Sequence, residues 1–324
     1  MNNSPSLPAE SEDRQFARLI HELEPEYTLV RTWTLTGGVS AHVTAFEIEH
    51  PDGWRKRLVV RRHGQADLYR NADVAADEFR LLDIVQAAGL VVPAPYYIDR
   101  SGEFFSTPCI VLEYVEGQQE FSPTNLEDYI VQFANQLAKI HQVRHTPDTG
   151  GPAADEQSPP VALSFLPQQA GRYAARLQNR PLEVDGSLQE GRIRTVLESV
   201  WPVPQQNPAA LLHGDYWPGN TVWRDGRLAA VIDWEDAEVG DPLADLGNTR
   251  LELLWSFGWD AMQRFTEVYR SMSDLNYTAL PYWDLWAALR PASKISAWAG
   301  DVTREAAMRA AHRLFVAQAL EALS

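Results

Sequence analysis

Hydrophobic positions recur with two different spacings along the chain, and the spacing changes near residue 116. Up to that point most apolar residues lie in short runs of β-branched and aromatic side chains, bounded by turn signals such as Pro51-Asp52-Gly53. These runs predict β-strands, the first three of them joined as an antiparallel meander. The predicted strands cover residues 28–35, 41–49, 55–62, 96–99 and 108–114.

Helical spacing occurs twice in this first part. Residues 13–23 carry an apolar stripe that ends before Pro25, and residues 71–88 carry a second stripe that stops at Gly89. We therefore expect a tail and a short helix over residues 1–26. A β-rich lobe with a five-stranded sheet and one main helix should then follow over residues 27–115.

Beyond Glu116 the spacing becomes predominantly helical. Residues 126–143 carry apolar side chains at helical spacing, with Asn125 as an N-cap. Residues 146–162 are rich in Pro, Gly and small polar residues and predict an exposed loop. The fold class is thus α+β, with a larger, mostly helical lobe over residues 116–324. Further helices are predicted at 164–179, 187–200, 243–256, 259–273, 281–298 and 302–322.

One stretch of the helical lobe, residues 211–247, departs from this pattern. Two β-prone runs flank Asp225-Gly226, a dipeptide that favours a tight hairpin turn. Asp215 and Asn220 precede the first run, and Asp233 follows the second. Because a hairpin brings its two ends together, we expect these two carboxylates and one amide to meet. The two runs cover residues 221–223 and 228–232.

Such a group of oxygen atoms favours a bound cation. Two carboxylates in one small volume repel each other, and Mg²⁺ is commonly bound by few protein oxygens together with phosphate oxygens. The order Asp215, Asn220, hairpin, Asp233 also matches the template of phosphoryl transfer in protein kinases. The alternative is a metal-free buried polar turn, which would leave costly charges without a partner.

Composition narrows the partners. The chain has 324 residues, 45% of them hydrophobic, and a formal net charge of −16. This charge argues against nucleic acid and against anionic membranes as partners. An acidic protein that handles phosphates must supply cations locally, and it could also favour a cationic acceptor substrate.

The single cysteine and the N-terminus bear on localisation. Cys109 lies in an apolar run, so we expect a buried thiol with no intrachain disulfide, which fits a reducing compartment. The first residues are polar and lack the apolar core of a secretory signal, and no apolar run is long enough for a membrane helix. We therefore expect a cytoplasmic protein; the oligomeric state is not readable.

At this point a family resemblance becomes visible. The motifs His213-Gly214-Asp215-Tyr216-Trp217-Pro218-Gly219-Asn220 and Ile232-Asp233-Trp234-Glu235 closely resemble those of the aminoglycoside phosphotransferase family, kinase-like small-molecule kinases related to choline and fructosamine kinases. The resemblance covers most of the chain from about residue 27 onward. It implies a two-lobed protein-kinase-like fold, ATP or GTP and Mg²⁺ as cofactors, and a small molecule with a hydroxyl group as the acceptor.

The resemblance also implies roles for individual residues. Asp215 would be the catalytic aspartate that positions the acceptor hydroxyl, while Asn220 and Asp233 would bind Mg²⁺, with ATP between the lobes. In the first lobe it assigns nucleotide contacts to a phosphate loop, an ion pair and an adenine-contacting linker. These are Gly37, Gly38 and Ser40 for the loop, Arg61 with Glu78 for the ion pair, and Glu113 to Val115 for the linker.

One residue departs from the family pattern. Kinases usually carry a lysine where this chain has Arg61, although arginine can still clamp phosphate with two hydrogen bonds. Histidine at the start of a tight loop more often fixes the loop than transfers protons, so we expect His213 to bond to backbone. Asp241 and Asp245 are expected to cap a helix and to brace the loop.

Two other classes of function remain open. A metal-dependent phosphohydrolase could use His213, Asp215 and Asp233 as ligands, but it would not need Arg61 and Glu78. A nucleotide-binding regulatory protein without turnover would fit the missing lysine. The acceptor is also open, because nothing in the sequence separates an aminoglycoside from a macrolide, a choline-like alcohol or a sugar. Nine of the eleven tryptophans lie beyond residue 116, where they either form core or line an acceptor pocket.

Overall fold

The computed structural model describes residues 11–35, 41–143, 163–178, 181 and 184–324. It divides into two compact units, which we call the sheet unit and the helical unit. The chain passes from the first to the second between Val115 and Glu116, and the short segment Ala87–Val92 also belongs to the helical unit. The predicted N-terminal tail up to residue 10 and the whole of the predicted loop at 146–162 lie outside the described residues.

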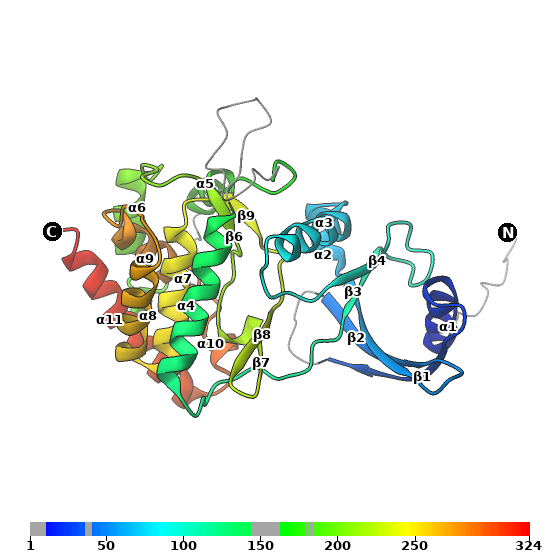
Figure 1. The fold of residues 1–324 in the computed structure, drawn as a ribbon. Coiled ribbons are helices and arrows are strands. Elements are labelled where there is room, and N and C mark those ends of the chain that lie inside the picture. Colours follow the sequence, from blue (N-terminus) through cyan, green and yellow to red (C-terminus); the bar gives the residue numbers. More distant parts are fainter. Residues whose placement is uncertain (1–10, 36–40, 144–162, 179–180, 182–183) are drawn as a thin grey trace, which may run out of the picture. The chain divides into compact units, whose positions relative to one another are not determined.

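The sheet unit is built on an antiparallel five-stranded sheet with the order β1-β2-β3-β5-β4 (Figure 1). The meander of the first three strands and the total of five strands confirm the prediction. Pairing runs without a shift along the whole of β2 and β3, from Ala41 opposite His63 to Glu49 opposite Arg55. The strands are β1 (Thr28–Thr34), β2 (Ala41–Glu49), β3 (Arg55–His63), β4 (Pro95–Asp99) and β5 (Cys109–Glu113).

The central strand β3 separates two environments, because successive side chains point to opposite faces of a sheet. Leu58 and Val60 join the core cluster that includes Phe16 of helix α1 (Glu12–Leu23). Arg61, on the other face, contacts Glu78 of helix α3 (Val74–Ala87). The predicted main helix of this unit is α3. A short helix that was not predicted, α2 (Gln65–Arg70), precedes it, because six residues are too few to show a helical period.

The core of the sheet unit contains the single cysteine. Cys109 is buried in the same cluster as Phe16, whose ring lies 5.1 Å from that of Phe105 and 5.4 Å from that of Phe46. Burial raises the pKa of the Cys109 thiol to about 12. The expectation of a buried structural thiol is confirmed.

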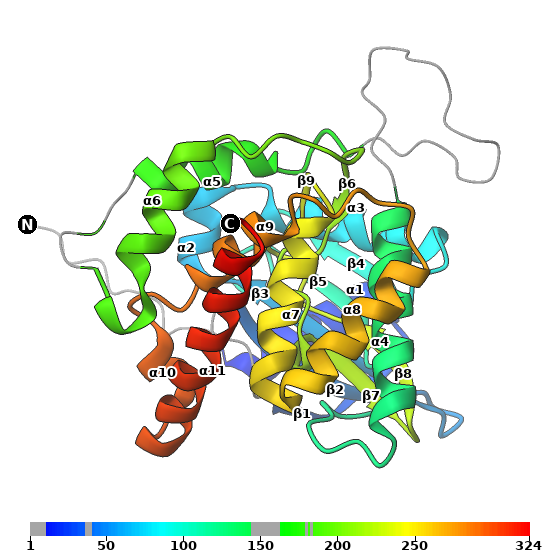
Figure 2. The same ribbon diagram turned by 90° about the vertical axis from the view of Figure 1, so that its left-hand side faces the viewer.

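The helical unit contains most of the predicted helices, among them α4, α7 and α8, which run side by side in Figures 1 and 2. At the start of α4 the Asn125 side chain accepts a hydrogen bond of 3.1 Å from the Asp128 backbone, which confirms the predicted N-cap. This unit also contains further α-helices and the 3-10 turn η1. Their bounds are α4 (Leu126–Gln142), α5 (Gln169–Gln178), η1 (Gly186–Leu188), α6 (Glu190–Val200), α7 (Leu243–Phe257), α8 (Trp259–Ser271) and α11 (Val302–Glu321).

The predicted helix over residues 281–298 is wrong. The structure has two helices there, α9 (Leu280–Ala288) and α10 (Ile295–Ala299), separated by a turn that contains Arg290 and Pro291. Proline has no backbone N–H and disfavours helical backbone in the residue before it, so a continuous helix through this position is costly. The break places Arg290 in a turn rather than on a helix face.

Two short strand pairs frame the residues of interest in the helical unit. β7 (Thr221–Arg224) and β8 (Arg227–Val231) form the predicted hairpin, and Asp225 and Gly226 both have the positive φ, 51° and 72°, that its tight turn requires. A second pair, β6 (Ala210–Leu212) with β9 (Glu238–Gly240), was not predicted because its strands have only three residues each.

Candidate active site

The hairpin brings together the residues that flank it. Thr221 pairs with Val231 at the open end of the β7–β8 ladder, and the next pair outward is closed by a 3.0 Å hydrogen bond from the Ile232 N–H to the Asn220 carbonyl. Asp233 follows Ile232 directly. The 3-10 turn η2 (Pro218–Asn220) leads back from there to Asp215.

Asn220 holds Asp215 in place. Its side-chain Nδ2 donates one hydrogen bond of 2.9 Å to the Asp215 carbonyl and another of 3.2 Å to the Asp215 carboxylate. Because the amide nitrogen is used on this side, the amide oxygen Oδ1 is the atom left to act as an acceptor or a ligand. The predicted meeting of Asp215 and Asn220 is therefore observed.

His213 links the loop that contains Asp215 to Ile232, the residue that follows strand β8. Its Nδ1 accepts a 3.3 Å hydrogen bond from the Asp215 N–H, so its Nε2 carries the proton that is donated to the Ile232 carbonyl at 3.0 Å. The ring is fully buried and both nitrogens are occupied. The expectation that His213 fixes the loop is confirmed. The phosphohydrolase alternative needs His213 as a metal ligand, but both of its ring nitrogens are already hydrogen-bonded.

Asp245 braces the same loop from helix α7. It accepts hydrogen bonds from the backbone N–H groups of His213, at 2.7 Å, and Gly214, at 2.9 Å. Burial would raise the pKa of Asp245, but the hydrogen bond and charge of His141 outweigh it and lower that pKa. Asp241 accepts a 3.0 Å bond from the Leu243 N–H at the helix start, so both expected roles are confirmed.

Arg290 is the residue that the sequence analysis missed. It donates hydrogen bonds of 2.6 Å to Oδ1 of Asp215 and 3.1 Å to the Gly214 carbonyl. Both side chains of the ion pair are partly exposed. Arg290 lies 75 residues from Asp215 in sequence and comes close because α9 packs against α7. No local pattern in the sequence indicates this contact.

Glu252 on α7 lies within the electric field of this pair. Burial raises the pKa of Glu252 to about 7, although the charge of Arg290 partly offsets that effect, and the negative charge of Asp215 adds to it. Arg304 also interacts with this carboxyl group. A carboxyl group that titrates near neutrality in such a setting is typical of functional sites.

Asp233 has an unusual backbone. Its φ is +67°, in the left-handed region that residues other than glycine rarely adopt, and such strain often occurs at functional sites. The Asp233 carboxylate and the Asn220 amide oxygen are both hard oxygen donors, which fits Mg²⁺ because this ion commonly takes one or two carboxylates and completes its shell with water and phosphate oxygens. Among the described residues, no group of three or more His, Cys, Asp or Glu could hold a metal ion.

The sheet unit contains a buried cluster around Glu78. Arg61 Nε lies 3.1 Å from Glu78 Oε2, and His63 Nε2 lies 3.0 Å from the same oxygen. Burial would raise the pKa of Glu78, yet the charge of Arg61 and the hydrogen bond of His63 outweigh it and lower that pKa. The predicted ion pair is present. His63 was missed because the strand was predicted to end one residue too early.

The other predicted nucleotide contacts can be placed only in part. Glu113 ends strand β5 with its side chain exposed, and its backbone N–H donates a 2.9 Å hydrogen bond to the Ala94 carbonyl. Val115 is partly exposed just beyond that strand. The predicted phosphate loop, with Gly37, Gly38 and Ser40, lies outside the described residues.

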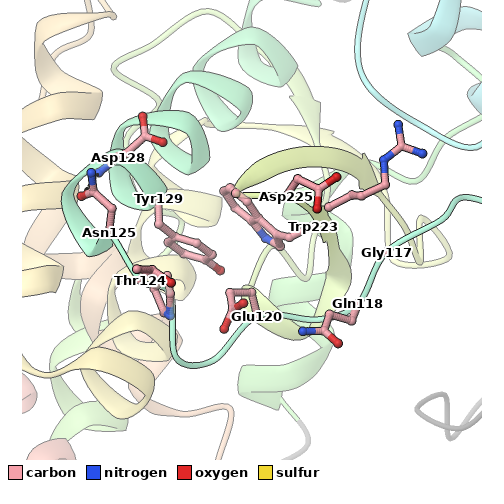
Figure 3. A pocket seen from close by; sticks show the side chains of 12 residues that line it. Gly117, Gln118, Glu120, Thr124, Asn125, Asp128, Tyr129, Trp223 and Asp225 are labelled. Atoms are coloured by element: carbon pink, nitrogen blue, oxygen red, sulfur yellow. Dashed lines mark hydrogen bonds between the residues drawn. The ribbon is translucent and has the colours of Figure 1, made fainter.

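A cavity of about 470 Å³ lies between the tip of the β7–β8 hairpin and the segment from Gly117 to Tyr129. Figure 3 shows Tyr129 and Trp223 in it, and their stacked rings have centroids 4.1 Å apart. Gln118 forms a two-way backbone bridge with Trp223 at the cavity's edge. None of the predicted site residues lines this cavity, so it is separate from the Asp215 site.

The two units together show the class of protein. An antiparallel five-stranded sheet with a buried Arg–Glu pair, followed by a helical unit with an Asp-Asn-hairpin-Asp arrangement, is the organisation of kinase-like phosphotransferases. The model of the phosphotransferase enzyme family matches residues 34–272. The chain therefore belongs to this family.

Relatives by sequence are distant and of mixed kinds. Mouse acyl-CoA dehydrogenase family member 10 is 25% identical over 203 residues, which cover 59% of this chain and 18% of that protein. A homoserine kinase of Phenylobacterium zucineum is 26% identical over 204 residues, 59% of each chain. The chain thus spans less than two thirds of the length of the relatives it matches.

Solved structures share the fold over nearly the whole chain. The macrolide 2'-phosphotransferase MphH from Brachybacterium faecium has a TM-score of 0.58 at 19% identity, covering 91% of this chain and 97% of the other. The GDP and kanamycin complex of APH(2'')-IIIa has a TM-score of 0.59 at 16% identity, covering 94% and 96%. Among the described residues of this chain, no helix has the length and apolar character needed to cross a membrane.

Proposed function

We propose that this protein is a small-molecule kinase, which transfers the γ-phosphoryl group of ATP or GTP to a hydroxyl group of a small acceptor. The observation that carries the proposal is the arrangement at the hairpin: His213, Asn220 and Asp245 hold the Asp215 loop against the strand end that leads into Asp233. Such a rigid arrangement of carboxylates suits phosphoryl transfer, in which positioning and electrostatics supply most of the catalysis.

Asp215 would orient the acceptor. Its two carboxylate oxygens are already fixed by Arg290 and by Asn220, and each oxygen retains a lone pair that can accept a hydrogen bond from a hydroxyl group. Arg290 holds a positive charge against the carboxylate, with a hydrogen bond of 2.6 Å to Oδ1. An orienting role for Asp215 fits a loose transfer of the phosphoryl group, in which positioning of the reactants matters most.

The nucleotide and the metal have separate supports. Asn220 and Asp233 would hold Mg²⁺, which would neutralise the charge of the phosphate oxygens when bound. In the sheet unit, Arg61 is fixed by Glu78 and His63, and it would contact phosphate as lysine does in other kinases. Glu113 to Val115 would contact adenine or guanine, and Gly37, Gly38 and Ser40 would cover the phosphates.

A screen of hydroxyl-bearing metabolites and antibiotics with γ-labelled ATP and with GTP tests the proposal. We expect label transfer to at least one acceptor, dependent on Mg²⁺ and abolished by EDTA. Asp215→Ala serves as the inactive control. Release of free phosphate without a phosphorylated acceptor would instead support a hydrolase and contradict the proposal.

A nucleotide-binding protein without turnover is the second candidate. It is favoured by Arg61 at the position of the usual lysine and by the ion pair that Asp215 makes with Arg290. A thermal shift with ATP and Mg²⁺, but no phosphorylated product over the whole library, would support it. The same shift with a product supports the kinase.

A further inference from the structure

Arg290 lies where the acceptor of the proposed reaction must bind. A hydroxyl group that donates to Asp215 has to come within about 3 Å of its carboxylate, and Arg290 is 2.6 Å from one oxygen of that carboxylate. The substituents of the acceptor nearest the hydroxyl therefore lie within a few ångströms of a guanidinium group that is charged at every physiological pH.

The guanidinium group still has donors to offer. It carries five N–H groups, and the described part of the chain supplies hydrogen-bond acceptors for two of them, the Gly214 carbonyl and Asp215 Oδ1. About a quarter of the side chain is exposed, so the remaining donors can be reached from solvent. A planar fork of N–H groups is the preferred protein partner of carboxylate and phosphate groups.

The carboxylate of Asp215 is hydrogen-bonded to Arg290, and the charges of Asp236 and Glu252 also act on the guanidinium group. Asp215 accepts a second hydrogen bond from the neutral amide of Asn220. Glu252 also interacts with Arg304, and burial raises the pKa of Glu252 to about 7. An ammonium group next to the acceptor hydroxyl would be repelled by Arg290, whereas a carboxylate there would be attracted.

An aromatic cluster adjoins the same position. Tyr173 is close enough to Arg290 to interact with its guanidinium group. The Tyr173 ring packs edge-on against Trp286 of α9, with centroids 4.5 Å apart. Trp201 lies 5.3 Å from Trp286. Tyr173 and Trp201 are partly exposed, which gives the acceptor an apolar wall beside the guanidinium group.

We propose that the acceptor is a hydroxy acid, a molecule with an anionic group a few bonds from the hydroxyl, and that Arg290 both positions Asp215 and binds this anionic group. This inference rests on the proposed kinase function. It departs from the acidic composition of the whole chain, which taken alone favours a cationic acceptor. The transfer itself is unchanged: the acceptor oxygen bonds to phosphorus, the bond to the bridging oxygen of the nucleotide breaks, and the hydroxyl proton leaves through Asp215.

Matched acceptors test the charge preference. We would compare linear hydroxy carboxylates with diols and amino alcohols of the same chain length, using kcat/KM for phosphorylation and calorimetry for binding. We expect the hydroxy carboxylates to exceed the amino alcohols by about 100-fold, the size expected for a hydrogen bond to a charged group. Equal or better use of the amino alcohols would overturn the inference.

The Arg290→Gln variant separates binding from folding. We expect it to lose about 100-fold in kcat/KM for the hydroxy carboxylate, mostly through KM, and clearly less for the diol, which lacks the anionic group. Arg290→Lys should recover part of the anion preference but not the two-point contact. Arg264→Gln, which breaks an exposed ion pair with Glu127, is the matched control and should change neither value. An equal loss for acid and diol would show that Arg290 only supports Asp215.

Binding decides the inference even without turnover. If no acceptor of any charge is phosphorylated, the proposed function fails, and calorimetry with the hydroxy carboxylate alone still tests Arg290. Binding that Arg290→Gln abolishes supports an anion site at this position. No binding to the wild-type protein, or binding that Arg290→Gln leaves unchanged, overturns it.

Discussion

The protein contains two arginine–carboxylate pairs of similar chemistry and different surroundings. Arg61 and Glu78 in the sheet unit are buried, with 9% and 3% of their side chains exposed, whereas Arg290 and Asp215 in the helical unit keep 24% and 28%. Because the first pair is shielded from solvent, neither charge can be separated from its partner without a large free-energy cost. The second pair stays in contact with water and can accept a further partner.

The comparison indicates a division of labour. In the buried pair a third residue, His63, contacts the same oxygen of Glu78, so the cluster holds Arg61 in one geometry. In the open pair the third residue is Asn220, which contacts the other oxygen of Asp215 and leaves lone pairs for an acceptor. Breaking the first pair should therefore lower stability in addition to disturbing the phosphate contact proposed for Arg61, whereas breaking the second should act mainly on turnover.

The largest effect is expected when Asp215, the carboxylate of the open pair, is removed. Asp215→Ala should lower kcat by about 10²- to 10⁴-fold, because the acceptor hydroxyl loses the group that orients it. Nucleotide affinity, measured by calorimetry with a non-hydrolysable ATP analogue, should stay close to that of the wild type. A loss of nucleotide affinity as large as the loss of rate would contradict the assignment.

Breaking the buried pair should act on stability instead. Glu78→Gln leaves the buried Arg61 without this carboxylate, and we expect the free energy of unfolding to fall by about 3–5 kcal/mol in denaturant titrations. The control is Glu127→Gln, which removes the partner of Arg264 from an exposed pair and should leave the free energy of unfolding almost unchanged. Equal costs for the two variants would remove the distinction between buried and open pairs.

A smaller effect should come from the third member of the buried cluster. His63→Ala removes the ring whose Nε2 lies 3.0 Å from Glu78 Oε2, and we expect a loss of about 1–3 kcal/mol in the free energy of unfolding. Combined with Glu78→Gln, the loss should be less than the sum of the two single losses, because both changes disrupt one cluster. Strict additivity would show that His63 acts independently of Glu78.

The smallest expected effect is a pH dependence of stability that arises from Glu252, whose charge interacts with the open pair. The folded protein raises the pKa of Glu252 from 4.5 to about 7, so protonated Glu252 stabilises it, and this contribution is lost as the pH rises through about 7. The Tm of the wild type should therefore exceed that of Glu252→Gln by less at about pH 8 than at about pH 6, with a difference of roughly 2–4 °C. A difference between the two proteins that does not change with pH would contradict this titration.

Local signals explain how much of the site could be predicted. The Asp225-Gly226 turn and the β-prone runs beside it specify the hairpin, and the hairpin in turn brings Asn220 next to the residue before Asp233. All of these lie within one short stretch of sequence. The sheet was predictable for the same reason, since its first three strands are joined by short connections.

Long-range packing explains what could not be predicted. Arg290 reaches Asp215 only because α9 packs on α7, a contact for which the sequence has no periodic signal. The turn that carries Arg290 did have a signal, Pro291, which marks the end of the helix. His63 was also readable, because it shares a strand face with Arg61 two residues earlier.

The single buried cysteine has a practical consequence for observing the protein in solution. A thiol whose pKa is about 12 is almost wholly protonated at neutral pH, and protonated thiols react slowly with maleimide reagents. Cysteines introduced at Tyr69 in the sheet unit and Leu314 in the helical unit, both well exposed, could therefore be labelled with fluorophores without removing Cys109. Energy transfer between the two dyes would then report, molecule by molecule, whether the distance between the two labelled positions responds to nucleotide or acceptor.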